Sequence, residues 1–143
     1  MTRQIKYIVV HCTATPPEAK AENIVRYWKE QLGWKNPGYH YIIRRNGEIV
    51  QLLSEDQVSN GVKNYNQHSV HISYIGGIDK NNKPLDNRTP EQKAALFNKL
   101  VALSEKYPGA EIKRHRDFPG VTKACPSFDV RTWLKEYIPE GVT

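Results

Sequence analysis

The chain has 143 residues, which is the length of one ordinary domain rather than two. Hydrophobic residues make up 38% of it and charged residues 25%, with eight Tyr and three Trp, and this composition excludes wholesale disorder. Lys plus Arg number 21 against 15 for Asp plus Glu, and the resulting net charge of +6 suits either an anionic partner or simply a solvated surface.

The first half of the chain predicts a strand, a helix and a β-hairpin. β-Branched and apolar residues favour the strand, and apolar residues at helical spacing favour the helix, which should end at Gly33 with Trp28 and Leu32 facing inward. The pair Asn46-Gly47 favours a two-residue type I′ hairpin turn. The expected ranges are Lys6–Cys12 for the strand, Glu18–Leu32 for the helix, and Tyr39–Arg45 and Glu48–Leu53 for the hairpin.

The second half predicts two more strands and two more helices. Thr89 opens a capping box with Pro90 at the first helical position, and the polar stretch 81–88 before it reads as a surface loop. The expected ranges are Ser69–Ile75 and Glu111–His115 for the strands, a helix from Thr89 to Tyr107, and a helix over Asp129–Ile138. The resulting order, β α β β β α β α, predicts a single α/β domain with a mixed central β-sheet flanked by about three helices.

Two histidines and one cysteine are candidates for metal binding. His11 and His115 each end a predicted strand, and strand ends are where sites collect in α/β sheets. Cys125 follows His115 by ten residues, and two imidazoles with one thiolate form a suitable three-ligand set for catalytic zinc. The spacing matches no closed zinc-finger pattern. From the residues alone, two polar strand-end histidines and one buried cysteine remain the alternative.

The remaining candidates each have a structural alternative. Cys12 should point to the opposite face from His11, as a core thiol or as half of a Cys12–Cys125 bridge. His40 is expected in packing or at the surface and His68 in an exposed turn. His71 either lines a substrate groove or only alternates with its apolar neighbours, and Trp34 is either a lid on the core or a platform for stacking a sugar.

Membrane and nucleic-acid functions find little support in the sequence. No run approaches the roughly 18 apolar residues that cross a bilayer, so membrane insertion is not expected. The basic residues are scattered and carry no RNA-binding aromatic signature, so nucleic acid is not an expected partner. The N-terminus lacks an apolar stretch of signal-peptide length, which predicts synthesis in the cytoplasm and release by another route.

Four segments together carry a family resemblance. They are VHCTAT at 10–15, GWKNPGYHYIIRRNGEI at 33–49, YNQHSVHISYIGGID at 65–79 and RHRDFPGVTKACPSFD at 114–129. In this order they resemble the short phage-lysozyme type of N-acetylmuramoyl-L-alanine amidase, which is related in fold to the peptidoglycan recognition proteins. The resemblance covers nearly the whole chain, from about Lys6 to Lys135.

The resemblance implies a zinc amidase that forms one catalytic domain over residues 1–143 and acts on peptidoglycan in the cell wall. The bond cut would be the amide between N-acetylmuramic acid and the L-alanine of the stem peptide. One Zn²⁺ per chain would be held by His11, His115 and Cys125, with Tyr39 and Lys123 as catalytic residues. Neither the residues that bind substrate nor the oligomeric state follows from it.

Two alternatives and one departure accompany the resemblance. Non-catalytic peptidoglycan binders share this fold but typically lack the cysteine ligand, and a phage relative also binds RNA polymerase as a regulator. The departure is Asn60, in Ser59-Asn60-Gly61, where relatives often carry a histidine. This substitution leaves the substrate preference and the pH optimum open.

Overall fold

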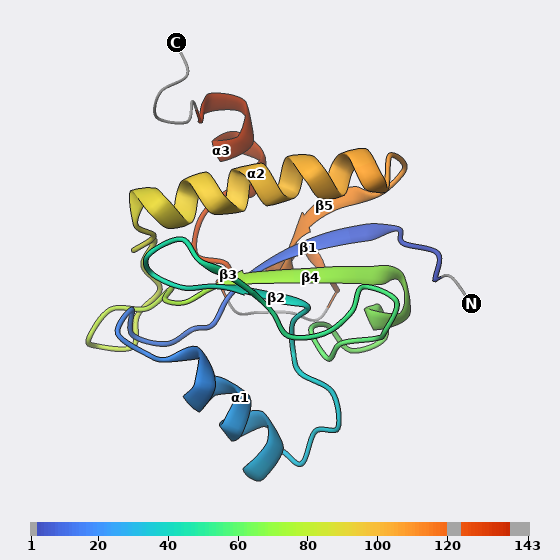
Figure 1. The fold of residues 1–143 in the computed structure, drawn as a ribbon. Coiled ribbons are helices and arrows are strands. Elements are labelled where there is room, and N and C mark those ends of the chain that lie inside the picture. The colour runs from blue at the N-terminus through green and yellow to red at the C-terminus, as the bar shows by residue number, and fades with distance from the viewer. Residues whose placement is uncertain (1–2, 120–123, 138–143) are drawn as a thin grey trace.

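The structure is a computed structural model that describes residues 3–119 and 124–137. Its five strands form one sheet in the order β3-β2-β4-β1-β5, shown in Figure 1. The elements are β1 (Tyr7–Cys12), α1 (Ala21–Glu30), β2 (Tyr41–Ile43), β3 (Ile49–Gln51), β4 (Ser69–Tyr74), α2 (Pro90–Lys106), β5 (Glu111–Arg114) and α3 (Val130–Glu136), with short 3₁₀ turns η1 (Asn66–His68) and η2 (His115–Asp117). The expected order of strands and helices and the α/β class are confirmed.

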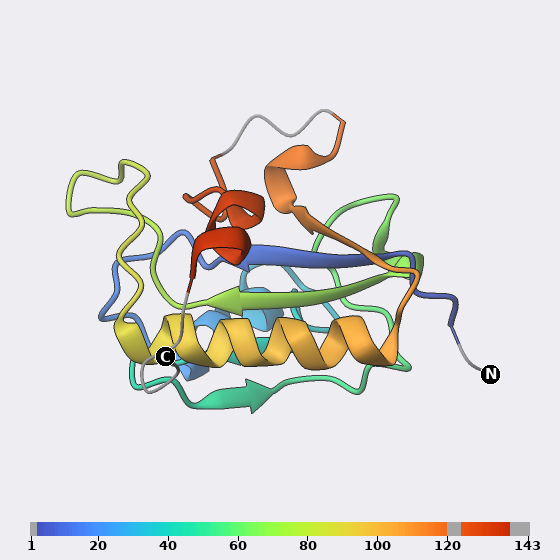
Figure 2. The same cartoon turned by 90° about the horizontal axis from the view of Figure 1, so that it is seen from above.

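The sheet is mixed and lies between helices. Strand β1 pairs in parallel with β4 and β5, β4 also pairs in parallel with β2, and only β2 and β3 are antiparallel. Helix α2 runs along one face with α3 beside it, and α1 lies on the other face, as Figures 1 and 2 show from two directions. Both faces are therefore covered, which explains why the central strands read as continuous apolar runs.

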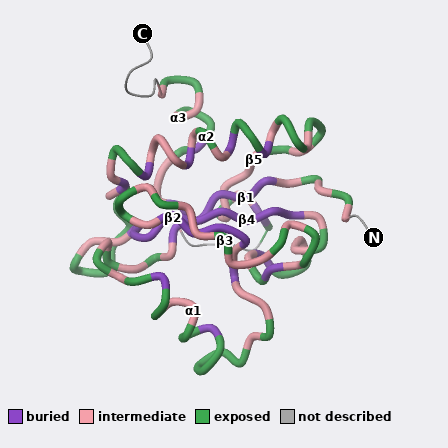
Figure 3. Tube along the Cα trace, viewed as in Figure 1, coloured by how far each residue is buried: buried purple, intermediate pink, exposed green. Residues whose placement is uncertain are grey.

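The central strands β1 and β4 form the buried middle of the molecule, coloured purple in Figure 3. Alternate residues of each strand divide between two environments. Val10 and Ile72 face the larger apolar core, which includes Leu96 and Leu100 of α2. The opposite face of the same two strands carries His11 and His71 instead, and this face holds the candidate site.

Local signals correctly predicted the start of the second helix and the position of the hairpin, but not the type of its turn. The Thr89 side chain accepts from the Gln92 amide, and the Gln92 side chain caps the Thr89 amide, so the expected capping box is confirmed. The expected type I′ turn is wrong: Arg44 and Glu48 close a three-residue loop, and only Gly47 has a positive φ, at 89°. A type I turn followed by a left-handed glycine is the usual three-residue hairpin.

The ends of elements also differ from expectation. Helix α1 is shorter than predicted, and Leu32 lies beyond its end with 43% exposure instead of facing inward. The N-terminal segment is bound to the rest of the fold, since the Arg3 guanidinium donates to the carbonyls of Glu55, Asn66 and Ser69. Across the described residues, no helix is both long enough and apolar enough to cross a membrane.

Candidate metal centre and active site

The structure brings His11, His115 and Cys125 together. The parallel strands β1 and β5 are neighbours, so the residues at and just beyond their carboxyl ends meet at one edge of the sheet. One donor atom from each of the three side chains lies within 4.8 Å of the others, and His11 Nδ1 is 4.0 Å from Cys125 Sγ. His11 and Cys125 are buried, whereas His115 is partly exposed.

The electrostatics of this cluster suit metal ligands. Burial, and then the neighbouring His71 and His115, hold the pKa of His11 well below its ordinary value, so the imidazole is neutral and keeps a lone pair. The Cys12 amide donates to Cys125 Sγ at 3.1 Å. A backbone N–H that points at the sulfur favours the thiolate, which is the form that binds metal.

Cys12 itself lies outside the metal-ligand cluster. Its side chain is 3% exposed and belongs to the core beneath α2, as expected for the face opposite His11. Cys12 and Cys125 are both free thiols, so the alternative of a bridge between them is wrong. The Cys125 side chain, by hydrogen bonding, lowers the pKa of the Cys12 thiol to about 7.

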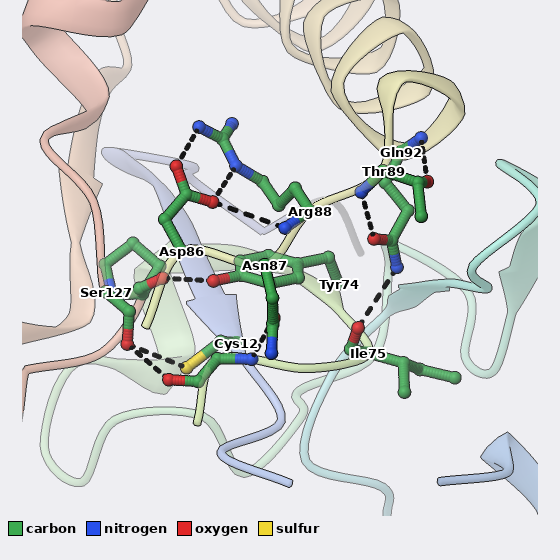
Figure 4. A network of polar contacts seen from close by, with 11 residues as sticks. Cys12, Tyr74, Ile75, Asp86, Asn87, Arg88, Thr89, Gln92 and Ser127 are labelled. Carbon is green, nitrogen blue, oxygen red and sulfur yellow. Dashed lines mark hydrogen bonds and ion pairs between the residues drawn. The ribbon is translucent and has the colours of Figure 1, made fainter. Parts of the chain in front are cut away.

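The segment that carries Cys125 is fastened to the end of β4 by side-chain hydrogen bonds, shown in part in Figure 4. The Tyr74 hydroxyl donates to the Pro126 carbonyl at 2.6 Å, and the Ser127 hydroxyl donates to the Gly77 carbonyl at 2.9 Å. A Cβ at Gly77 would lie 2.4 Å from Cys12 Sγ, so only glycine permits this close approach. The position of Cys125 thus depends on groups outside its own segment.

Arg88 strengthens the same attachment, contrary to the expectation that residues 81–88 form only a polar surface loop. Its side chain is 2% exposed and pairs with Asp86 at 2.8 Å, as Figure 4 shows. Its guanidinium lies 3.4 Å from the ring centroid of Phe128 and 4.5 Å from that of Trp133. Arginine stacks on aromatic rings in this way because its charge is delocalised over a plane.

Tyr39 lies against the metal-ligand cluster. Its ring centroid is 4.9 Å from that of His11, and its hydroxyl donates to the Cys12 carbonyl at 3.2 Å. Trp28 packs edge-on against it at 5.3 Å. Burial is the first cause that raises the pKa of Tyr39 far above its ordinary value, so the phenol keeps its proton at any physiological pH.

Two hollows lie near the candidate site and meet at Ala14. One, of about 420 Å³, runs between the end of β1 and α1 and includes Tyr39 in its wall. The other, of about 520 Å³, includes Cys125 and the loop around Asn82. Trp34 is partly exposed and stacks on the buried Trp28 beside a third hollow of about 270 Å³, a position that fits a lid on the core.

The other histidines have different environments from one another. His40 is fully buried, which confirms the expectation of packing over that of a surface position. His71 is also fully buried and lies directly behind His11, so it does not line a groove. His68 is half-buried rather than exposed and contacts the Gln4 carbonyl through Nδ1 at 2.9 Å. Lys123 lies outside the described residues.

Sequence reasoning missed the residues that support the ligands. Arg88 and Tyr74 gave no signal of their own, since one stands in a polar stretch and the other in a buried strand. His71 did give one, because a histidine inside a strand that is otherwise apolar needs a buried partner. Asn60, at the position of the family departure, is exposed, and its side chain donates to the Asn36 carbonyl at 2.8 Å.

Three donor groups that could hold a metal ion lie together at one edge of an α/β sheet, and one of them, Cys125, also lines an open hollow. The family model for N-acetylmuramoyl-L-alanine amidase matches residues 1–128. The chain therefore belongs to this family, and its reaction is the hydrolysis of the amide between N-acetylmuramic acid and L-alanine in peptidoglycan.

Individual relatives agree with this assignment. The endolysin of Klebsiella phage KP32 is 40% identical over 135 residues, which cover 94% of this chain and 88% of the relative. Among solved structures, the Ph2119 endolysin from a Thermus scotoductus bacteriophage superposes with a TM-score of 0.80 at 26% identity, covering 95% and 86% of the two chains. Bumblebee PGRP-SA shares the fold, with a TM-score of 0.73 at 17% identity, covering 97% and 87%.

Proposed function

We propose that this peptidoglycan amidase is zinc-dependent and that residues 1–143 form one catalytic domain with one Zn²⁺ held by His11, His115 and Cys125. The observation that carries the proposal is the proximity of the three donor atoms, all within 4.8 Å of one another. Two imidazole nitrogens and one thiolate are ligands that zinc prefers, and three protein ligands are the number found in catalytic zinc sites.

The donor set fits the ion in chemistry and approximately in size. In a tetrahedral site the ligand atoms are separated by about 3.3–3.7 Å, and here His11 Nδ1 and Cys125 Sγ are 4.0 Å apart, with all three donors within 4.8 Å. When bound, zinc supplies a Lewis acid that activates water and polarises the amide carbonyl. Burial keeps His11 neutral, so the ion does not have to displace a proton from it.

Tyr39 is proposed to donate a hydrogen bond to the reacting groups. Tyr39 lines one hollow, and its hydroxyl donates to the Cys12 carbonyl. Because its pKa is raised far above the ordinary value, the phenol holds its proton rather than acting as a base. It can therefore orient water or the developing oxyanion by donation.

Lys123 is proposed to stabilise the oxyanion with its cationic side chain, as the family resemblance implies. It stands two residues before Cys125 in the chain, and both Ala124 and Cys125 line the 520 Å³ hollow. A cation directed at a developing oxyanion contributes about 3–4 kcal/mol in comparable enzymes. Neither Lys123 nor Tyr39 is required to hold zinc.

The two hollows offer space for both sides of the scissile amide. One would take the N-acetylmuramyl side and the other the stem peptide, because the two hollows meet at Ala14 and carry Tyr39 and Cys125 in their walls. The net charge of +6 suits a substrate that carries carboxylates. We propose that the enzyme is made in the cytoplasm and acts on the wall after release.

The test is digestion of purified peptidoglycan with metal analysis of the same protein sample. We expect about one zinc per chain, new L-alanine N-termini and no new reducing sugar ends. Release of reducing ends would mean that a glycosidic bond is cut and would contradict the amidase reaction. Full turnover by a protein that holds no zinc would contradict the metal assignment while leaving the amidase reaction in place.

A further inference from the structure

His71 lies behind His11, on the far side from the other metal-ligand candidates. The His11 Nε2 and His71 Nδ1 atoms are 2.8 Å apart, and both side chains are almost completely buried. The opposite nitrogen of His71, Nε2, lies 2.9 Å from Asn66 Oδ1. A continuous line of hydrogen bonds thus runs from η1 through β4 to the ligand on β1.

The direction of each hydrogen bond in this line is set by Asn66, the residue farthest from His11. The Val62 amide donates to Asn66 Oδ1 at 2.7 Å, which identifies that atom as the oxygen. An oxygen can only accept, so His71 Nε2 must carry the hydrogen. A neutral His71 then has a lone pair at Nδ1, and the hydrogen between the two rings must belong to His11 Nε2. His11 Nδ1 is left with a lone pair, 4.0 Å from Cys125 Sγ.

Gly61 makes room for this arrangement. A Cβ added at residue 61 would lie 2.4 Å from His71 Nδ1, the atom that faces His11. The φ of Gly61 is not positive, so the backbone does not require glycine there. A side chain at this position would instead occupy the space that the His71 ring fills.

We propose that His71 is a positioning residue that, together with Asn66 and Gly61, fixes His11 in the Nε2–H tautomer and directs its Nδ1 lone pair to the metal. The inference rests on the proposed function, in which His11 binds zinc. Partners of this kind on ligating histidines typically change metal affinity by 10- to 100-fold when they are removed. Here the partner is a second histidine rather than a carboxylate or a backbone carbonyl.

The first experiment reads the tautomer directly. Long-range ¹H–¹⁵N correlation spectra of the metal-free, wild-type protein report which nitrogen of each histidine carries hydrogen. We expect His11 and His71 both as Nε2–H tautomers. A His11 that carries its hydrogen on Nδ1 would overturn the proposal, whatever the variants do.

The second experiment measures zinc affinity by competition with a chromophoric chelator, using folded protein. His71→Leu removes the acceptor at similar volume, and we expect its zinc Kd to rise 10- to 100-fold. His71→Asn restores an acceptor close to the Nδ1 position and should recover most of the affinity. Gly61→Ala keeps the histidine but displaces its ring, so a smaller loss is expected. His68→Leu is the matched control, since the His68 side chain contacts the Gln4 carbonyl and lies outside the hydrogen-bonded line to His11, and its Kd should not change.

The outcomes separate the inference from the function on which it rests. A wild-type protein that binds no zinc would contradict the proposed function itself. Tight zinc binding by wild type and an equal Kd in His71→Leu would contradict only the role of His71. If His71→Leu does not fold, the wild-type spectra and the Kd of Gly61→Ala still decide between the two possibilities.

Discussion

The candidate metal ligands come from two regions that are held in different ways. His11 is the penultimate residue of β1, which pairs in parallel with β4 over its whole length and with β5 as far as Val10, and which is buried from Ile8 onward. Cys125 lies outside the sheet, in a segment held by side-chain contacts from Tyr74, Ser127 and Arg88. The sheet therefore fixes the first ligand through its backbone. The last ligand depends on a polar network assembled from distant parts of the chain.

The largest expected effect comes from removing Cys125, the candidate ligand that lies outside the sheet. Cys125→Ala should lose its zinc and more than about 10³-fold of its turnover, because a Lewis acid contributes several kcal/mol to the barrier. The measurement is the zinc content and the rate of release of L-alanine N-termini in the same samples. Val101→Ala, at an exposed position of α2, is the control and should leave zinc binding intact. Zinc retained by Cys125→Ala would remove this residue from the ligand set.

The next effect concerns the attachment of the loop. Arg88→Met leaves Asp86 without its partner and removes the stacking on Phe128, so we expect the free energy of unfolding to fall by about 2–3 kcal/mol. Urea denaturation measures the change. Arg26→Met, on the exposed side of α1, should stay within about 0.5 kcal/mol of wild type. Equal stabilities for the two variants would show that Arg88 does not fasten the segment.

A similar effect, on rate rather than stability, is expected at Tyr39, which packs against the strand residue His11. Tyr39→Phe removes only the hydroxyl, so the packing against His11 and Trp28 should survive while turnover falls by about 10²-fold. Steady-state rates with zinc content measured in parallel test this prediction. Unchanged zinc with near-wild-type turnover would exclude the Tyr39 hydroxyl from the reaction.

The smallest effect should follow from a single hydrogen bond of the network. Tyr74→Phe removes the donor to the Pro126 carbonyl, and we expect a loss of about 1 kcal/mol in the free energy of unfolding. If the network positions Cys125, the zinc Kd should also rise by a few fold. A Tyr74→Phe protein that loses stability without any change in the zinc Kd would limit the network to a structural role.

The sequence predicted what depends on local patterns. Strand and helix order followed from apolar periodicity, and the start of α2 followed from the capping box at Thr89. The turn type of the hairpin was wrong because Asn46-Gly47 is compatible with two loop lengths, and strand pairing decides between them. The burial of Arg88 could not be predicted, because it depends on Phe128 and Trp133, about 40 residues away in the chain.

The residues of the candidate site also differ in how far the sequence alone could identify them. Strand-end positions and residue type drew attention to His11, His115 and Cys125, but the choice between a metal site and unrelated side chains, and the addition of Tyr39 and Lys123, came only through the family resemblance. No spacing rule relates residues that far apart. His71 was visible as a polar residue in a buried strand, yet its partner could be identified only once the register between β1 and β4 was known.

That register has a consequence for how the protein can fail. Because side chains alternate between the faces of β4, sliding this strand by one residue against β1 would bury His71 and Ser73 in the apolar core and expel Ile72 and Tyr74 from it. A misaligned chain would therefore lose its core and its hydrogen-bonded histidine pair together. Enzymatic activity in a variant therefore also indicates that its strands are correctly aligned. Digestion of the cell wall can serve as a simple screen for correct folding.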